Sequence, residues 1–188
     1  GNEGWMLKLS GHTIQCIMDS GADSHGVTAS STFKNDTTGA NSGDGWHHVA
    51  MVFDGGGADN AAKLKCYKNG ALMPLTFTGT IPSTTDNSLA GENLFIGHDD
   101  VSDQYFSGNI AQVGIWQDAL TQAEIRSIKE KTYSELTTSE KTNLISFWTL
   151  DSAVTATMRT SSGSDPENMV VADVHNGETL GSEQFIGA

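Results

Sequence analysis

The sequence predicts an all-β protein in which two antiparallel sheets pack face to face, with one or two short helices at their edge. Short apolar segments alternate with polar residues at a period of two, which is typical of strands that bury one face. The segments between them are rich in Gly, Ser, Thr, Asn and Asp, the residues that favour turns. A chain of 188 residues is long enough to form one domain with its own core.

Two strands are predicted near the start of the chain. The first covers residues 4–9 and places Trp5, Leu7 and Leu9 on one face. The second covers residues 13–18 and follows a tight turn. Together they form the first antiparallel pair of the predicted sandwich.

The strongest strand signal covers residues 46–53. Both of its faces are apolar, which predicts a central position in a sheet. A weaker, more polar strand is predicted over residues 27–33, and loops are predicted over residues 35–45 and 54–62.

A β-hairpin is predicted around the dipeptide at residues 69–70. Residues 63–68 alternate cleanly, so that Cys66 points inward and Tyr67 points outward. Asn-Gly follows at once and is the strongest short-range hairpin signal, because both central positions of a type I′ turn need positive φ. The returning strand is predicted over residues 71–77.

Helical signals appear only after this region. A capping box at residues 121–124 predicts the start of a short amphipathic helix, with Ile125 and Ile128 on its apolar side. A second capping box at residues 137–140 predicts one or two further helical turns.

The remaining strands and the domain boundary complete the prediction. Three strands are expected over residues 93–97, 109–116 and 144–150. Residues 151–188 are rich in Ser, Thr and Gly, and they are predicted to form an irregular extension that packs on the sandwich or leads to a further module. The predicted domain therefore spans residues 1–150.

Net charge and the length of the apolar runs argue against two classes of partner. Asp and Glu number 23 against 10 Lys and Arg, a formal charge of −13, and no basic stripe is present, so nucleic acid is not an expected partner. No apolar run approaches the ~18 residues that span a membrane, so membrane insertion is not expected. The acidic surface serves solubility, or part of it gathers around a hard cation.

Two cysteines, Cys16 and Cys66, each lie inside a predicted strand. Buried free thiols are common in strand interiors, and this interpretation is favoured. A disulfide between the two strands is the alternative that the sequence leaves open.

Six short segments follow one another in a characteristic order: residues 45–50, the Asp-Gly loop after them, 64–70, 94–97, 106–116 and 119–125. This order resembles the laminin G-like, concanavalin A-like family. The resemblance implies a jelly-roll sandwich that lacks the family's usual first strands. Residues 136–151 and 171–181 are also similar to segments of tailed-bacteriophage structural proteins, which implies a place in a virion.

Catalysis is not expected from this sequence. The resemblance also covers retaining glycosidases with this fold, which use two carboxylates ~5 Å apart on one strand. No such pair lies in an apolar segment of this sequence. The motifs of serine hydrolases, zinc proteases and phosphate-binding loops are also missing. A glycan hydrolase or lyase therefore ranks last among the functions considered.

An acidic loop is predicted over residues 98–103. It holds the best metal-binding candidates, Asp99, Asp100 and Asp103, which are three carboxylates within five residues. Ca²⁺ takes ~6–8 oxygen ligands, so these residues would supply part of its coordination shell, and the family resemblance adds to this interpretation. The alternative is that the aspartates make turns. Similar pairs occur in other loops: Asp19 with Asp23, and Asp54 with Asp59.

Other candidate residues are histidines and aromatic residues. His47 and His48 are adjacent and so point to opposite faces of a strand, which predicts one packed and one exposed imidazole. Tyr105 is the best exposed ring for stacking on a sugar, whereas Phe106 is expected to anchor its strand. At least three of the four tryptophans, Trp5, Trp46, Trp116 and Trp148, are expected to pack in the core.

These observations favour a non-catalytic binding module on a virion surface or another extracellular assembly. It would engage a cell-surface or extracellular glycan through loops, with Ca²⁺ as a cofactor. The predicted ligand-binding residues are His98, Tyr105, Asp19 and Asp23. The alternative is a structural virion module that contacts only neighbouring subunits.

Overall fold

The computed structural model describes residues 4–10, 12–19, 24–28, 46–84, 94–99, 104–106 and 108–150. The chain divides into two compact units. The first consists of Gly1–Ala90 and Ala119–Glu130, and the second of Gly91–Asp118 and Lys131–Ala188. Each unit is described by itself.

The first unit contains a four-stranded antiparallel sheet with the strand order β1-β2-β3-β7. Its strands are β1 (Gly4–Ser10), β2 (Thr13–Asp19), β3 (His25–Val27) and β7 (Thr76–Thr78). The two predicted N-terminal strands are thus confirmed. The predicted strand over residues 27–33 meets β3 only at Val27, and residues 29–33 lie outside the described part of the chain.

A second antiparallel sheet in this unit has the order β4-β5-β6. Its strands are β4 (Val49–Phe53), β5 (Leu64–Lys68) and β6 (Ala71–Met73), and helix α1 (Asn60–Lys63) precedes β5. Asn69 and Gly70 connect β5 to β6 with φ angles of 52° and 75°, which confirms the predicted turn with two positive φ values. Among the described residues β4 pairs with β5 alone. It therefore lies at the edge of this sheet, whereas a central position was predicted.

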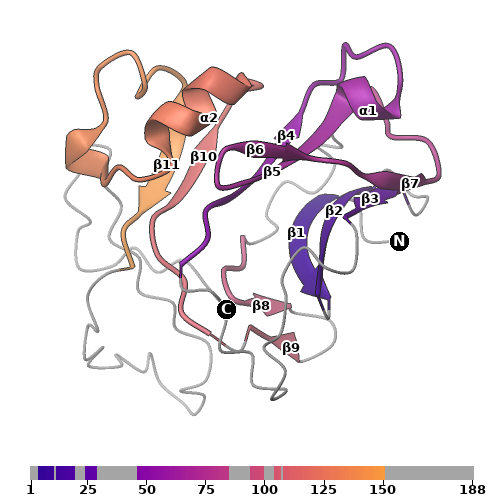
Figure 1. Cartoon of the computed structure of the whole chain (residues 1–188), viewed down its shortest axis with the longest axis horizontal. Helices are drawn as coiled ribbons and strands as arrows, with labels where there is room; N and C mark the ends of the chain where they lie inside the picture. Colours follow the sequence, from indigo (N-terminus) through magenta and orange to yellow (C-terminus); the bar gives the residue numbers. More distant parts are fainter. Residues whose placement is uncertain are drawn as a thin grey trace, which may run out of the picture. The chain divides into compact units, whose positions relative to one another are not determined.

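The strand predicted over residues 71–77 is interrupted. Pro74 follows β6 directly and cannot donate a backbone hydrogen bond, so the ladder with β5 ends at Met73. The chain then pairs again as β7, in the other sheet and beside β3. In Figure 1 this segment continues from β6 towards β3, so a single stretch of chain links the two sheets.

The core of the first unit lies between these two sheets. Ile14, Cys16 and Met18 of β2 pack with Leu64 and Cys66 of β5, and all five are at most 2% exposed. Ile81, which is fully buried, completes the cluster. Two antiparallel sheets therefore share one core, as expected from the alternating apolar residues.

Helix α2 (Gln122–Ile128) covers the outer face of the second sheet. Ile125 packs with Val52 and Tyr67 in a second buried cluster. The predicted capping box is present, because the backbone N–H of Thr121 donates to Glu124 Oε2 at 2.7 Å and the N–H of Glu124 donates to Thr121 Oγ1 at 3.3 Å. Tyr67 points away from the core as predicted, yet it is only 4% exposed.

The second unit contains two short antiparallel pairs. One joins β8 (His98–Asp99) to β9 (Gln104–Tyr105), and the other joins β10 (Val113–Trp116) to β11 (Leu144–Trp148). Residues 94–97 are not a strand, contrary to the prediction for residues 93–97. β10 begins later than predicted, since Gln112 has a φ of 55°, which is outside the strand region.

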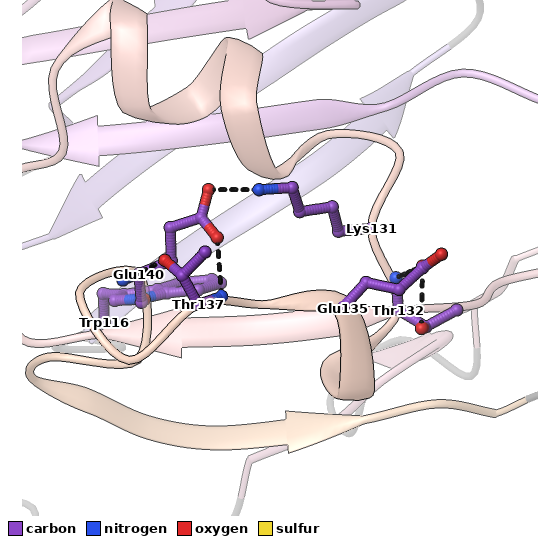
Figure 2. Close-up of polar contacts among 6 residues, drawn as sticks. All are labelled: Trp116, Lys131, Thr132, Glu135, Thr137 and Glu140. Carbon is purple, nitrogen blue, oxygen red and sulfur yellow. Dashed lines mark hydrogen bonds and ion pairs between the residues drawn. The ribbon is translucent and has the colours of Figure 1, made fainter.

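Capping boxes organise the segment between β10 and β11. Thr132 and Glu135 cap the 3₁₀ helix η1 (Tyr133–Glu135), a T-x-x-E signal that the sequence reasoning overlooked. Thr137 and Glu140 form the predicted second box, but it opens a turn and not a helix. The Glu140 carboxylate also accepts a hydrogen bond from Lys131 Nζ at 2.6 Å, and its backbone carbonyl accepts one from the indole N–H of Trp116 at 2.8 Å. Figure 2 shows these residues.

Candidate functional site

The candidate site centres on the hairpin of β8 and β9 in the second unit. His98 pairs with Tyr105 and Asp99 pairs with Gln104. The backbone N–H of Phe106 donates to the carbonyl of Gly97 at 2.8 Å and extends the ladder by one step. His98 and Asp99 therefore lie in a strand, which corrects the prediction of a loop at this point.

Two exposed aromatic residues end this hairpin. Tyr105 is 61% exposed and Phe106 is 40% exposed. The ring of Phe106 lies over Gly108, where an added Cβ would approach Phe106 Cε1 to 2.8 Å. Phe106 contacts its own chain at Gly108, whereas Tyr105 has the larger exposed fraction. The anchoring role expected for Phe106 stays a prediction.

The acidic candidates fall mostly outside the described residues. Asp100, Asp103 and Asp23 lie there entirely, as do the side chains of His98, Asp99 and Asp19. The backbone positions of His98, Asp99 and Asp19 are described. The hairpin register makes residues 100–103 the connection between β8 and β9, and Asp19 ends β2 opposite Gly4. Their assignment to metal or ligand binding stays a prediction.

No group of three or more His, Cys, Asp and Glu side chains that could hold a metal occurs among the residues that the structure describes. In the same part of the chain, no helix has both the length and the apolar character needed to cross a membrane.

Asp54 and Asp59 have structural roles. Asp54 Oδ1 accepts the backbone N–H of Gly56 at 3.0 Å inside the turn after β4. Asp59 Oδ1 accepts the N–H of Ala62 at 2.8 Å and caps α1. For this pair, the alternative that aspartates make turns is confirmed.

The adjacent histidines are organised by Asn69. Its Oδ1 accepts the backbone N–H of His48 at 2.9 Å, and its Nδ2 lies 3.2 Å from Nδ1 of His47. Both imidazoles are half-buried, so the predicted contrast between one packed and one exposed ring is wrong. Burial, and secondly the positive charge of Lys129, lowers the pKa of His48.

The tryptophans divide evenly between packed and exposed positions. Trp148 is 3% exposed, and the half-buried Trp116 donates its indole N–H to the carbonyl of Glu140. Trp46 and Trp5 are 69% and 46% exposed, so the expectation that at least three would pack is wrong. Trp46 lies before β4 and not within it, and the sequence reasoning missed this exposed ring.

The arrangement presents exposed side chains that can take part in surface recognition. The structure pairs the positions of two predicted ligand-binding residues, His98 and Tyr105, on one hairpin. It places a third, Asp19, in the first unit. An exposed aromatic ring with carboxylates nearby in the chain can stack on the apolar face of a sugar and accept hydrogen bonds from its hydroxyls.

Comparisons with known proteins agree with this description. A laminin G model, described as the concanavalin A-like lectin/glucanases superfamily, matches residues 1–126. No curated protein and no solved structure matches the chain. The matched residues include both sheets of the first unit and the β8–β9 hairpin. With its antiparallel sheets and few short helices, the chain has the predicted jelly-roll sandwich fold and belongs to the concanavalin A-like lectin/glucanase superfamily.

Proposed function

We propose that the chain is a non-catalytic module that binds a cell-surface or extracellular glycan through the β8–β9 hairpin. The observation that carries this proposal is Tyr105, which is 61% exposed and paired in register with His98. Membership of a superfamily of lectins and glucanases supports a carbohydrate as the ligand class. The carboxylate pair that a glycosidase needs has no counterpart in the apolar segments of the sequence.

Ring stacking explains why Tyr105 is the central residue. One face of a pyranose carries C–H groups and is apolar, so it packs against an aromatic ring while the sugar hydroxyls remain available for hydrogen bonds. Asp100 and Asp103 lie in the connection of the same hairpin, and their carboxylates would accept hydrogen bonds from those hydroxyls. Asp19 and Asp23 belong to the first unit, so their role in ligand binding is proposed separately from the hairpin.

Calcium dependence is part of the proposal. Asp99 ends β8. Asp100 and Asp103 follow it in the sequence, so three carboxylates fall within five residues. Carboxylate oxygens are the ligands that Ca²⁺ prefers, and backbone carbonyls of a tight connection commonly complete its shell. The bound ion would be held by residues that closely precede Tyr105 in the sequence.

A glycan array, probed with the full chain in Ca²⁺ and again in EDTA, tests ligand class and metal together. We expect binding to a restricted set of glycans in Ca²⁺ and its loss in EDTA. Binding that survives EDTA would overturn the calcium role alone, whereas a silent array in Ca²⁺ would overturn glycan binding.

A virion surface or another extracellular assembly is the proposed location, on the similarity of residues 136–151 and 171–181 to phage structural proteins. One observation favours the alternative of a purely structural virion module. Trp5, Leu7 and Leu9 lie on the same face as the core residues of β2, yet they are 46%, 39% and 41% exposed. Such an apolar face suits contacts with a neighbouring subunit. Assembly that fails in a Leu7→Ser variant, together with a silent array, would favour this alternative.

A further inference from the structure

Cys16 and Cys66 face each other inside the sandwich of the first unit. Cys16 lies on β2 and Cys66 on β5, so the two thiols come from different sheets. Both are 0% exposed and belong to the same core cluster. A hydrogen bond joins their side chains, and neither forms a disulfide.

The strands that carry the two cysteines approach each other closely. Packed sheets commonly lie about 10 Å apart, but β2 and β5 approach to within 8 Å between Cα atoms. A disulfide needs a Cα–Cα distance of roughly 4.4–6.8 Å, so the bridge forms if Cys16 and Cys66 come within that range. Met51 and Met73 flank Cys66 across its ladder, and their flexible side chains can adapt to that approach.

The hydrogen bond also makes the two thiols unequal. The hydrogen bond between the two thiols raises the pKa of Cys16 and lowers that of Cys66. Burial acts in the opposite direction on Cys66 and in the same direction on Cys16. With its pKa raised by the hydrogen bond and by burial, Cys16 stays protonated while the core is closed.

Burial determines when oxidation can happen. With both sulfurs fully covered, an oxidant as large as a tripeptide disulfide has no path to them in the folded protein. Before the core forms, both thiols are accessible. The redox state present at the moment of folding is then retained by the closed core.

We propose that Cys16 and Cys66 form an inter-sheet disulfide when the chain folds in an oxidising environment, and that burial afterwards preserves either the bridged or the dithiol state. With oxidised glutathione as oxidant, one cysteine thiolate attacks the glutathione disulfide and releases one glutathione thiolate. The second cysteine thiolate attacks the protein sulfur of the mixed disulfide and releases the other. The two cysteine protons pass to the two glutathione molecules, so one disulfide is reduced as one is formed.

The test compares refolding with incubation of the native protein. The reduced, unfolded full chain is refolded in a glutathione redox buffer or in excess reductant, and free thiols are counted by alkylation under denaturing conditions and mass spectrometry. We expect no alkylated cysteine in the monomer refolded with glutathione and two in the monomer refolded in reductant. The bridged form should melt about 10 °C higher.

Native, reduced protein incubated with oxidised glutathione should keep both thiols over the same period. Cys16→Ala and Cys66→Ala are the matched controls, and each should melt at the same temperature after either refolding. Two alkylated cysteines in the glutathione-refolded wild-type monomer would overturn the bridge, and so would a bridged form that melts no higher. Rapid oxidation of the native protein would overturn the role of burial. Even if the variants fail to fold, the mass of the alkylated wild-type monomer shows whether the Cys16–Cys66 bridge has formed.

Discussion

Tyr67 of β5 is buried beneath Ile125 of helix α2, although strand alternation directs its side chain away from the core. Helix α2 therefore makes the second sheet a middle layer, with apolar contacts on both of its faces. Arg126 Nε and Gln122 Nε2 each donate to the carbonyl of Gly70 at 3.0 Å, which fixes the helix on the β5–β6 turn.

Truncation of Ile125 tests the importance of this layer. Ile125 is 1% exposed, so Ile125→Ala should lower the free energy of unfolding by about 2–5 kcal/mol through lost burial and the remaining cavity. Ile145→Ala is the matched control, because Ile145 is 53% exposed and its loss should be below about 1 kcal/mol. Urea unfolding of both variants measures the difference, and equal losses would contradict the buried role of Ile125.

Neighbouring glycines after β4 should respond differently to a methyl group. A Cβ at Gly55 would overlap the backbone carbonyl of Ser83, which cannot move without displacing its chain. Gly55→Ala should therefore cost about 1–3 kcal/mol of stability. At Gly56 the nearest atom is Asp54 Oδ1 at 3.3 Å, the end of a side chain that can shift. Gly56→Ala should change the free energy of unfolding by less than about 0.5 kcal/mol. Thermal unfolding of the two variants measures the difference, and a larger loss in Gly56→Ala than in Gly55→Ala would refute this packing.

Glu140 and Glu135 allow a comparison of two capping boxes. The Glu140 carboxylate is 11% exposed and accepts hydrogen bonds from the Thr137 N–H and from Lys131 Nζ. Glu140→Ala should cost about 1–3 kcal/mol, because two hydrogen bonds to a largely covered, charged carboxylate are lost. Glu135→Ala removes the same kind of cap at an exposed position and should have a smaller effect. Chemical denaturation of both variants checks this ranking, which fails if Glu135→Ala is the more damaging.

His48 should make stability depend on pH. Burial holds its folded-state pKa below the usual value of 6.5, so the unfolded chain binds a proton first as the pH falls. Stability should thus decrease from about pH 7.5 through pH 6.5, and this contribution should level off below the folded-state pKa. His48→Gln should reduce the loss between about pH 7.5 and about pH 5.5, as measured by urea midpoints. An unchanged slope in the variant would contradict the buried, neutral imidazole.

Local signals in the sequence identified most elements of the fold. The Asn69–Gly70 turn and the Thr121 capping box depend on short-range backbone geometry, and both are confirmed. Alternation correctly assigned Cys66 to the inner face and Tyr67 to the outer face. It did not predict the burial of Tyr67, because what covers a face depends on a helix distant in the sequence.

The candidate site was harder to predict, since its position depends on pairing between strands. His98 and Asp99 were predicted to be loop residues because they begin a polar segment. Only their register with Tyr105 and Gln104 shows that they occupy strand positions. Trp46 read as a core residue because it adjoins an apolar run, yet β4 begins three residues later and leaves the ring 69% exposed. Pro74, by contrast, was a visible signal for the end of β6.

The most direct test of glycan recognition is the affinity of Tyr105 variants for a glycan that binds the wild-type chain, measured by titration calorimetry. Tyr105→Ala removes the exposed ring and should weaken binding about tenfold or more, whereas Tyr105→Phe keeps the ring and should remain within a few-fold of wild type. Unfolding midpoints near the wild-type value would show that both variants are folded. Wild-type affinity in Tyr105→Ala would contradict recognition through the β8–β9 hairpin.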